Sequence, residues 1–195
     1  MATGEGKPEQ ASVEQAVRTI LAWMGDDPGR SALEGTPRRV ALALSELSSG
    51  YREDPAALLT RGLEEAIGQQ LVVVRDINFH SLCEHHLLPF FGSAAIAYLP
   101  GGQLAGLSKL ARVVDAHARR LQVQERLTDE ITITLERGLR PRGLAVALTA
   151  EHLCMSMRGA ARPGHSTVTV ATRGELATNP AAREEALRLM AAPRP

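Results

Sequence analysis

Several features that would assign the chain to a common class are missing from its sequence. No apolar run approaches the roughly 18 residues that a membrane-spanning helix needs, and the N-terminus shows no signal peptide. Acidic and basic residues balance at 22 each, which gives no indication of a nucleic-acid-binding or membrane-binding surface. We therefore expect a cytoplasmic protein that binds neither nucleic acid nor membranes.

Lysine and cysteine are both scarce. Lys7 and Lys109 are the only lysines among the 22 basic residues, and Cys83 and Cys154 are the only cysteines. A disulfide between these cysteines is disfavoured, because nothing in the sequence directs the chain to an oxidising compartment. The simplest alternative is a pair of buried free thiols that act as small hydrophobic groups.

Both cysteines, however, have histidines close by. The run Cys83-Glu84-His85-His86 places a thiol, a carboxylate and two imidazoles in four consecutive residues. The Cys-x-x-His spacing of Cys83 and His86 lets a tight turn direct both side chains at one ion, and zinc binds thiolate and imidazole readily. The pattern therefore favours a zinc site. A catalytic site with an open position and a closed structural site both stay possible, because three spare donors lie nearby: Glu84, His85 and His152.

The second cluster, Glu151-His152-Leu153-Cys154, adds an acid or base. His152 and Cys154 are two residues apart, so on a β-strand their side chains share one face. If Cys154 binds the metal, His152 points into the same pocket, where it can transfer protons. A nearby cation also favours the thiolate, so metal binding and deprotonation of cysteine support each other.

Hydrophobic periodicity divides the chain into an N-terminal helical region and an α+β domain. Helices are predicted at 13–24, 36–50, 56–67, 108–120 and 122–137. Strands are predicted at 71–79, 94–99, 143–157 and 166–173. The expected divisions are a loose N-terminus at 1–10, the helical region at 11–69, the α+β domain at 70–176 and a tail at 177–195.

The order of these segments predicts a four-stranded antiparallel sheet with two helices on one face. Such a sheet leaves two edges and its second face uncovered. We therefore expect the chain to associate with copies of itself.

Polar groups near predicted helix starts are candidates for holding a substrate. Ser108, Lys109 and Arg112 could cradle a phosphate at a helix N-terminus, although an N-cap serine followed by solvated cations looks the same. Glu125 could accept hydrogen bonds from the N1–H and amino groups of guanine, or could simply lie on a solvated helix face. Arg158 could bring positive charge to the metal pocket. Three further arginines are interpreted as surface or interface charges: Arg119, Arg120 and Arg126.

Five stretches resemble the GTP cyclohydrolase I family, and the resemblance runs from about residue 12 to 176. They are the helix start at 33–38 and the stretches 81–86, 106–112, 120–128 and 152–159. The resemblance implies the tunnelling fold, in which subunit sheets associate into a barrel. It also implies an allosteric homodecamer with active sites assembled from neighbouring subunits.

The activity implied by this resemblance is the zinc-dependent conversion of GTP to 7,8-dihydroneopterin triphosphate and formate, the first step of pterin and tetrahydrofolate biosynthesis. The matching zinc ligands are Cys83, His86 and Cys154. The matching catalytic residues are His85, His152 and Ser108. The matching substrate-binding residues are Lys109, Arg112, Arg158 and a guanine anchor formed by Gln124 and Glu125.

The sequence departs from the family pattern at His117, where an aromatic residue is expected, at Val170 and in the loop 160–165. None of these positions is a ligand or a catalytic residue. The main alternative is a non-catalytic zinc-binding or purine-binding regulatory protein of the same fold. Zinc deaminase and His-Glu-x-x-His protease motifs are absent. The Cys-x-x-His spacing also disfavours a nitrile reductase with a nucleophilic cysteine.

Overall fold

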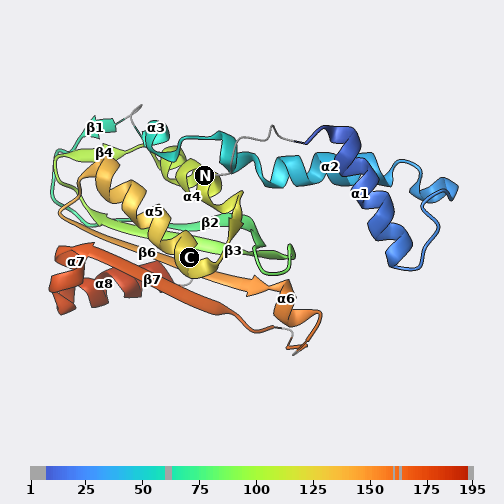
Figure 1. Cartoon of the computed structure of the whole chain (residues 1–195). Coiled ribbons are helices and arrows are strands. Elements are labelled where there is room, and N and C mark those ends of the chain that lie inside the picture. Colours follow the sequence, from blue (N-terminus) through green and yellow to red (C-terminus); the bar gives the residue numbers. More distant parts are fainter. Residues whose placement is uncertain (1–7, 60–62, 160, 163, 193–195) are drawn as a thin grey trace. The chain divides into compact units, whose positions relative to one another are not determined.

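The structure is a computed structural model that describes residues 8–59, 63–159, 161–162 and 164–192 (Figure 1). The chain divides after Ser48 into two compact units. No helix within the described ranges is long and apolar enough to cross a membrane.

Within the described residues, the first unit consists of two helices and a short 3-10 turn. Helix α1 spans Gln10–Trp23, the turn η1 spans Ser31–Leu33 and helix α2 spans Thr36–Leu47. A proline in the first turn of α2 suits a helix start, because its missing N–H has no partner there in any case. The helices pack through an apolar stripe. The helices predicted at 13–24 and 36–50 are confirmed.

The second unit is an α+β structure. Its first elements are η2 (Ser49–Arg52), α3 (Pro55–Leu59), β1 (Leu63–Glu65), β2 (Val72–Cys83), β3 (Pro89–Leu99) and β4 (Gln103–Ala105). Next come α4 (Leu107–Ala118), β5 (Leu121–Gln122), α5 (Gln124–Leu139) and β6 (Gly143–His152). The last are α6 (Leu153–Ser156), β7 (Thr167–Gly174), α7 (Glu175–Thr178) and α8 (Pro180–Ala191).

Among the described residues, the main sheet has the strand order β5-β2-β3-β6-β7. The four long strands pair antiparallel, which confirms the predicted α+β fold class. The two-residue strand β5 adds a short parallel pairing beside β2 that the sequence pattern did not predict. Strands β2 and β6 terminate at the same end of the sheet, so the residues that follow them come close together.

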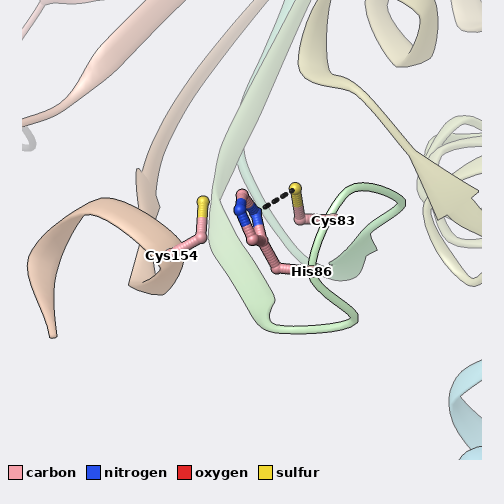
Figure 2. A group of neighbouring side chains, drawn as sticks. All are labelled: Cys83, His86 and Cys154. Carbon is pink, nitrogen blue, oxygen red and sulfur yellow. Dashed lines mark hydrogen bonds between the residues drawn. The ribbon is translucent and has the colours of Figure 1, made fainter. Parts of the chain in front are cut away.

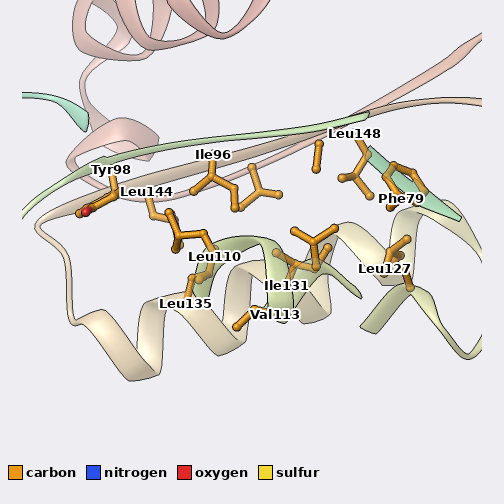
Figure 3. Close-up of a cluster of buried hydrophobic side chains, with 14 of the residues drawn as sticks. Phe79, Ile96, Tyr98, Leu110, Val113, Leu127, Ile131, Leu135, Leu144 and Leu148 are labelled. Atoms are coloured by element: carbon orange, nitrogen blue, oxygen red, sulfur yellow. The ribbon is translucent and has the colours of Figure 1, made fainter. Parts of the chain in front are cut away.

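Helices α4 and α5 cover one face of this sheet, as predicted (Figure 3). On α5, Leu127, Ile131 and Leu135 recur every four residues and form a buried stripe. Alternate residues of β6, such as Leu144 and Leu148, meet that stripe because strand side chains alternate between faces. This packing fixes the position of α5 against the sheet.

Helix α8 lies on the opposite face of the sheet (Figure 1). There Ala186 and Met190 pack against Ala97 and Ala145, the small outward residues of β3 and β6. Arg75 of β2 donates to the main-chain oxygens at the C-terminal end of this helix. The second face is therefore partly covered, by an element that the sequence placed only in the tail.

The helix predicted at 56–67 is wrong over its second half. Helix α3 ends at Leu59, and Leu63–Glu65 instead form β1, which pairs antiparallel with β4. Residues 60–62 lie outside the described residues. Pairing with a distant strand decides the conformation here, and local periodicity cannot detect such a partner.

Gly92 of β3 lies close against the backbone of β6. A methyl group at this position would overlap the main-chain oxygen of Thr149. We therefore predict that Gly92→Ala destabilises the protein by about 2 kcal/mol or more and lowers Tm by about 4–8 °C. Thermal melting at one fixed protein concentration checks this. The neighbouring variant Ser93→Ala is the control, with an expected effect within about 0.5 kcal/mol, and equal melting of the two variants would contradict the packing argument.

Candidate functional site

A Cys-His-Cys group lies where β2 and β6 end (Figure 2). Cys83 is the last residue of β2, His86 lies in the loop that follows, and Cys154 lies in α6. The three ligand atoms lie within 4.8 Å of one another, and Sγ of Cys83 is 3.9 Å from Nδ1 of His86. Donor atoms around a tetrahedral zinc ion are roughly 3.6–3.8 Å apart. The group therefore fits a metal ion after a small contraction.

The loop between β2 and β3 forms a tight turn held by its own main chain. The N–H of Leu87 donates to the oxygen of Cys83 at 2.8 Å, and the N–H of Cys83 donates to the oxygen of Leu88 at 2.9 Å. Leu87 adopts a left-handed φ of 55°, which is unfavourable for a bulky side chain and persists only where surrounding contacts impose it. This turn carries His86 back toward Cys83.

The prediction that His152 and Cys154 share one strand face is wrong. Strand β6 ends at His152, whose partner across the sheet is Phe90 of β3. The next four residues, Leu153–Ser156, form a helical turn, which the N–H of Met157 closes by donating to the oxygen of Leu153 at 3.1 Å. Cys154 reaches the metal group through this turn and not through the pleat of a strand.

The surroundings of Cys154 favour the neutral thiol when no cation is bound. Burial raises the pKa of the Cys154 thiol, and the adjacent Cys83 raises it further. The Arg158 guanidinium acts in the opposite direction. A bound cation would oppose the burial effect and stabilise the thiolate.

His152 is held on two sides. Its Nε2 lies 2.8 Å from Oε1 of Gln124, and its ring stacks on Phe90 with centroids 4.6 Å apart and planes 1° from parallel. Burial lowers the pKa of His152 and the nearby His165 lowers it further, whereas Glu125 acts in the opposite direction. Two contacts therefore fix the position of the imidazole, and its surroundings disfavour the charged ring.

His85 has a different environment. Its side chain is 64% exposed, with Nδ1 4.0 Å from Sγ of Cys83 and Nε2 4.0 Å from the carboxylate of Glu84. The ring also contacts that of His86 edge-on. Its exposure contrasts with the partly buried, stacked ring of His152.

The structure does not bring the predicted phosphate-binding residues to the metal group within one chain. Ser108, Lys109 and Arg112 lie in the first half of α4, and both Ser108 and Arg112 are exposed. Gly106 occupies the N-cap, so Ser108 is not the capping serine. The opposite end of α4 leads into β5, beside Cys83. At 1.5 Å per residue, Ser108 lies about 15 Å along the helix from that end.

The remaining predicted residues lie closer. Glu125 and Arg158 are exposed, and their electrostatic effects place them near His152 and Cys154 respectively. Gln124 is buried and contacts His152 directly. One chain thus gathers the three candidate metal ligands, the histidines His85 and His152 and these three residues at one end of the sheet.

Arg126 also belongs to this cluster at the end of the sheet, although the sequence suggested an ordinary surface charge. It forms an ion pair with Glu84 in the loop between β2 and β3, called the metal loop below. Its hydrogen bond holds the pKa of Glu84 below the usual range. Its Nε also donates to Oε1 of Gln122 at 3.0 Å. The main-chain oxygen of Gln122 in turn accepts from the N–H of Glu84 at 3.1 Å. The four-residue spacing of Gln122 and Arg126 was the available signal, but polar helix faces commonly show it.

Comparison with known proteins decides the family. Residues 13–191 match the family described as GTP cyclohydrolase I. The chain belongs to this family.

Relatives in the family are similar over most of their length. A GTP cyclohydrolase 1 from Brucella anthropi is 52% identical over 186 residues, which cover 95% of this chain and 86% of the relative. One from Brucella canis is 51% identical over 170 residues, which cover 87% of this chain and 80% of the relative. The predicted family and the predicted enzyme, a GTP cyclohydrolase I, are confirmed.

One solved structure is also similar, that of the archaeosine synthase QueF-Like in the apo form. The TM-score is 0.47 at 17% sequence identity, and the match covers 55% of this chain and 96% of that chain.

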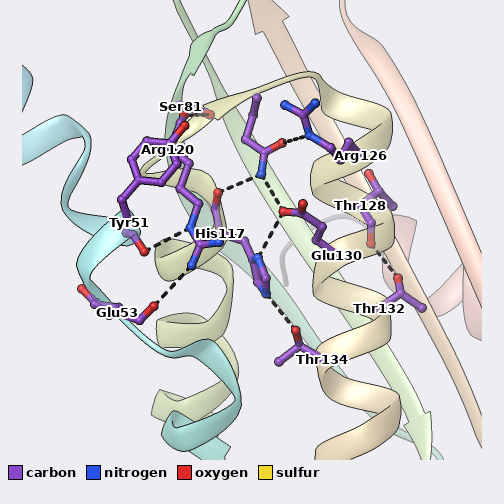
Figure 4. Close-up of polar contacts among 12 residues, drawn as sticks. Tyr51, Glu53, Ser81, His117, Arg120, Arg126, Thr128, Glu130, Thr132 and Thr134 are labelled. Carbon is purple, nitrogen blue, oxygen red and sulfur yellow. Dashed lines mark hydrogen bonds and ion pairs between the residues drawn. The ribbon is translucent and has the colours of Figure 1, made fainter. Parts of the chain in front are cut away.

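In this chain, the contacts of Arg126 continue into a buried polar network between α4 and α5 (Figure 4). Nε2 of Gln122 donates to the carboxylate of Glu130 at 2.8 Å. The same carboxylate lies 3.3 Å from Nδ1 of His117, whose Nε2 is 2.8 Å from the hydroxyl of Thr134. His117, where the resemblance predicts an aromatic residue, thus fills a buried position with a polar ring.

Removing Arg126 should weaken metal binding without touching a ligand. The variant Arg126→Met loses the ion pair with Glu84, so the loop that carries His86 becomes less ordered. We predict that the affinity for added Zn²⁺ falls about 10–100-fold, measured by competition with a chromophoric chelator. The control is Arg137→Met, which removes an exposed charge from the same helix. Equal affinity in the two variants would contradict the role of Arg126.

His117 should make the stability depend on pH. Burial lowers its pKa, the Arg120 charge lowers it further, and Glu130 acts in the opposite direction. Below about pH 6.5, the ordinary pKa of histidine, the unfolded chain therefore binds more protons than the folded one. The stability of the protein consequently decreases as the pH is lowered. We predict that wild type loses more stability than His117→Phe between about pH 7 and pH 5, measured by denaturant unfolding. A stability difference that stays constant over this range would refute the prediction.

Proposed function

We propose that the chain converts GTP to 7,8-dihydroneopterin triphosphate and formate in a zinc-dependent reaction that begins pterin and tetrahydrofolate biosynthesis. The observation that carries this proposal is the Cys-His-Cys group beside the fixed imidazole of His152, in a chain of the GTP cyclohydrolase I family. Hydrolysis of a purine ring needs activated water and a proton donor at the same carbon–nitrogen bond.

Cys83, His86 and Cys154 are the proposed zinc ligands. Two thiolates and one imidazole form a donor set typical of zinc, and three protein ligands leave one position open for catalysis. When bound, zinc activates water near neutral pH. The positive charge would also overcome the burial effect that holds Cys154 as a thiol.

His152 is the proposed acid. Protonation of guanine at N7 makes C8 a better electrophile, so water can add there and open the imidazole ring. A second hydrolysis releases C8 as formate. The exposed ring of His85 is suited to carry the further protons between the site and solvent.

The substrate would be held by charge and by hydrogen bonds. Glu125, with Gln124 beside it, forms the proposed guanine anchor, because a carboxylate can accept from both N1–H and the amino group. The proposed triphosphate ligands are Lys109, Arg112 and Arg158. Ser108 would assist at the sugar, whose opening, rearrangement and closure with loss of water complete the pterin.

The complete site is proposed to form between copies of the chain in a homodecamer. Two observations support this. Ser108 and Lys109 lie about 14–15 Å along α4 from the end beside Cys83, and strand β7 leaves an edge of the sheet unpaired within the described residues. Within one chain, residues 70–176 would then form the catalytic domain, which works in the cytoplasm.

The test is the reaction itself. Zinc-loaded wild type incubated with GTP should release formate and yield a pterin that fluoresces after oxidation. Cys154→Ala, which removes one proposed ligand, should lose both signals by at least about 100-fold, as should chelation of the metal. Met155→Ala is the control, because Met155 is an exposed neighbour in the same helical turn.

The pattern of signals separates the alternatives. Formate without pterin would show ring opening without closure. Neither signal from wild type, with zinc tightly bound, would refute catalysis and favour a zinc-binding or purine-binding regulatory protein. Full activity in Cys154→Ala would refute the assignment of the metal ligands.

A further inference from the structure

Gln124 is almost completely buried, and the hydrogen bonds of its side chain fix the orientation of the amide. It is 1% exposed. Its Nε2 lies 3.2 Å from the main-chain oxygen of Leu148 and 3.0 Å from that of Thr167. Carbonyl oxygens only accept hydrogen bonds. The nitrogen of the amide must therefore face the strands β6 and β7, and a flipped amide would set three acceptors against one another.

The rest of the network agrees with this orientation. The hydroxyl of Thr169 lies 3.1 Å from Nε2 of Gln124 and 2.7 Å from the hydroxyl of Thr128. Thr128 itself donates to the main-chain oxygen of Gln124 at 2.8 Å. Thr169 can therefore donate to Thr128, and each hydroxyl hydrogen has one acceptor. Both the side chain and the main chain of Gln124 are thus held in place.

This orientation determines which nitrogen of His152 carries a hydrogen. The amide oxygen of Gln124 faces Nε2 of His152 at 2.8 Å. Because an amide oxygen cannot donate, Nε2 must be the donor and must carry the hydrogen. In the neutral ring, Nδ1 then has the free lone pair.

Nδ1 of His152 is open, unlike the nitrogen bound to Gln124. Among the described residues, no hydrogen bond to this atom is present. The stack on Phe90 restricts rotation of the His152 ring about its Cβ–Cγ bond. A ring flip would also replace this hydrogen bond by a contact between the amide oxygen of Gln124 and a ring C–H, because Cε1 then takes the place of Nε2.

We propose that Gln124 is a positioning residue that holds His152 as the Nε2–H tautomer, so that Nδ1 exchanges the proton with the substrate. This inference rests on the proposed function, in which His152 is the acid. In the forward step the Nδ1–H bond of the imidazolium breaks and an N7–H bond of guanine forms. The ring is left neutral with its hydrogen on Nε2, and solvent water returns the proton to Nδ1.

The proposal changes the expected role of the Gln124 side chain. Its amide groups are fully engaged inside the protein, so recognition of guanine by side chains at this helix start would come from Glu125. Loss of the amide should consequently slow proton transfer more than it weakens GTP binding.

The direct test is the tautomer in the wild-type protein. Zinc-loaded wild type labelled with ¹⁵N-histidine is measured in the solid state at about pH 8, where the ring is neutral. The signals of His152 are assigned by their loss in His152→Asn. The expected result is a protonated Nε2 and an unprotonated Nδ1. The opposite tautomer, or an average of the two, overturns the proposal, and this measurement needs no Gln124 variant to fold.

A variant separates positioning from general packing. Gln124→Met keeps the length of the side chain but removes its polar atoms. We expect mixed tautomers of His152 and a fall in kcat for formate release of at least about tenfold, with KM for GTP changed by less than about threefold. Thr169→Val is the matched control, because it removes a contact of Gln124 but leaves both carbonyl acceptors and the bond to His152.

The outcomes distinguish this inference from the proposed function. A KM that rises while kcat and the tautomer stay unchanged would overturn positioning and return Gln124 to a substrate contact. Wild type that shows the Nε2–H tautomer but releases no formate would overturn the function while supporting the tautomer.

Discussion

The antiparallel register of β2, β3 and β6 is the constraint on which the site depends. It sets Leu82 opposite Pro89 and Phe90 opposite His152. The metal loop and His152, the proposed acid, therefore lie at the same end of the sheet. A slip of one residue would turn every side chain of a strand to the other face. The buried stripe of α5 prevents such a slip, because only one register buries Leu144 and Leu148 against it.

Helix α5 then connects the end of β6 with the loop after β2. Its first residue, Gln124, contacts His152 at the end of β6, and two residues later Arg126 contacts Glu84 in the loop after β2. These contacts diverge because residues two apart on a helix point in different directions. The metal loop and the imidazole are therefore positioned by one rigid element, and a shift of α5 would disturb both together.

The sequence predicted those features that local patterns encode. Four-residue spacing marked α5, β-branched runs marked β2 and β7, and the Cys-x-x-His motif indicated a metal group before any fold was known. The end of β6 could not be placed, because it depends on pairing with Phe90, some sixty residues earlier. The two-residue strand β5 likewise exists only through its partner. Arg126 and His117 were missed because a polar helix residue has the same pattern whether it faces solvent or a buried network.

The distance between the start of α4 and the metal group has a genetic consequence. If each working site takes Ser108, Lys109 and Arg112 from one copy and the metal ligands from another, then association between copies is itself under selection. Substitutions far from every site residue, at the contacts between copies, would abolish activity as completely as loss of a ligand. Loss-of-function alleles should thus fall in two separate regions of the surface, and two chains defective in different regions could restore each other within one assembly.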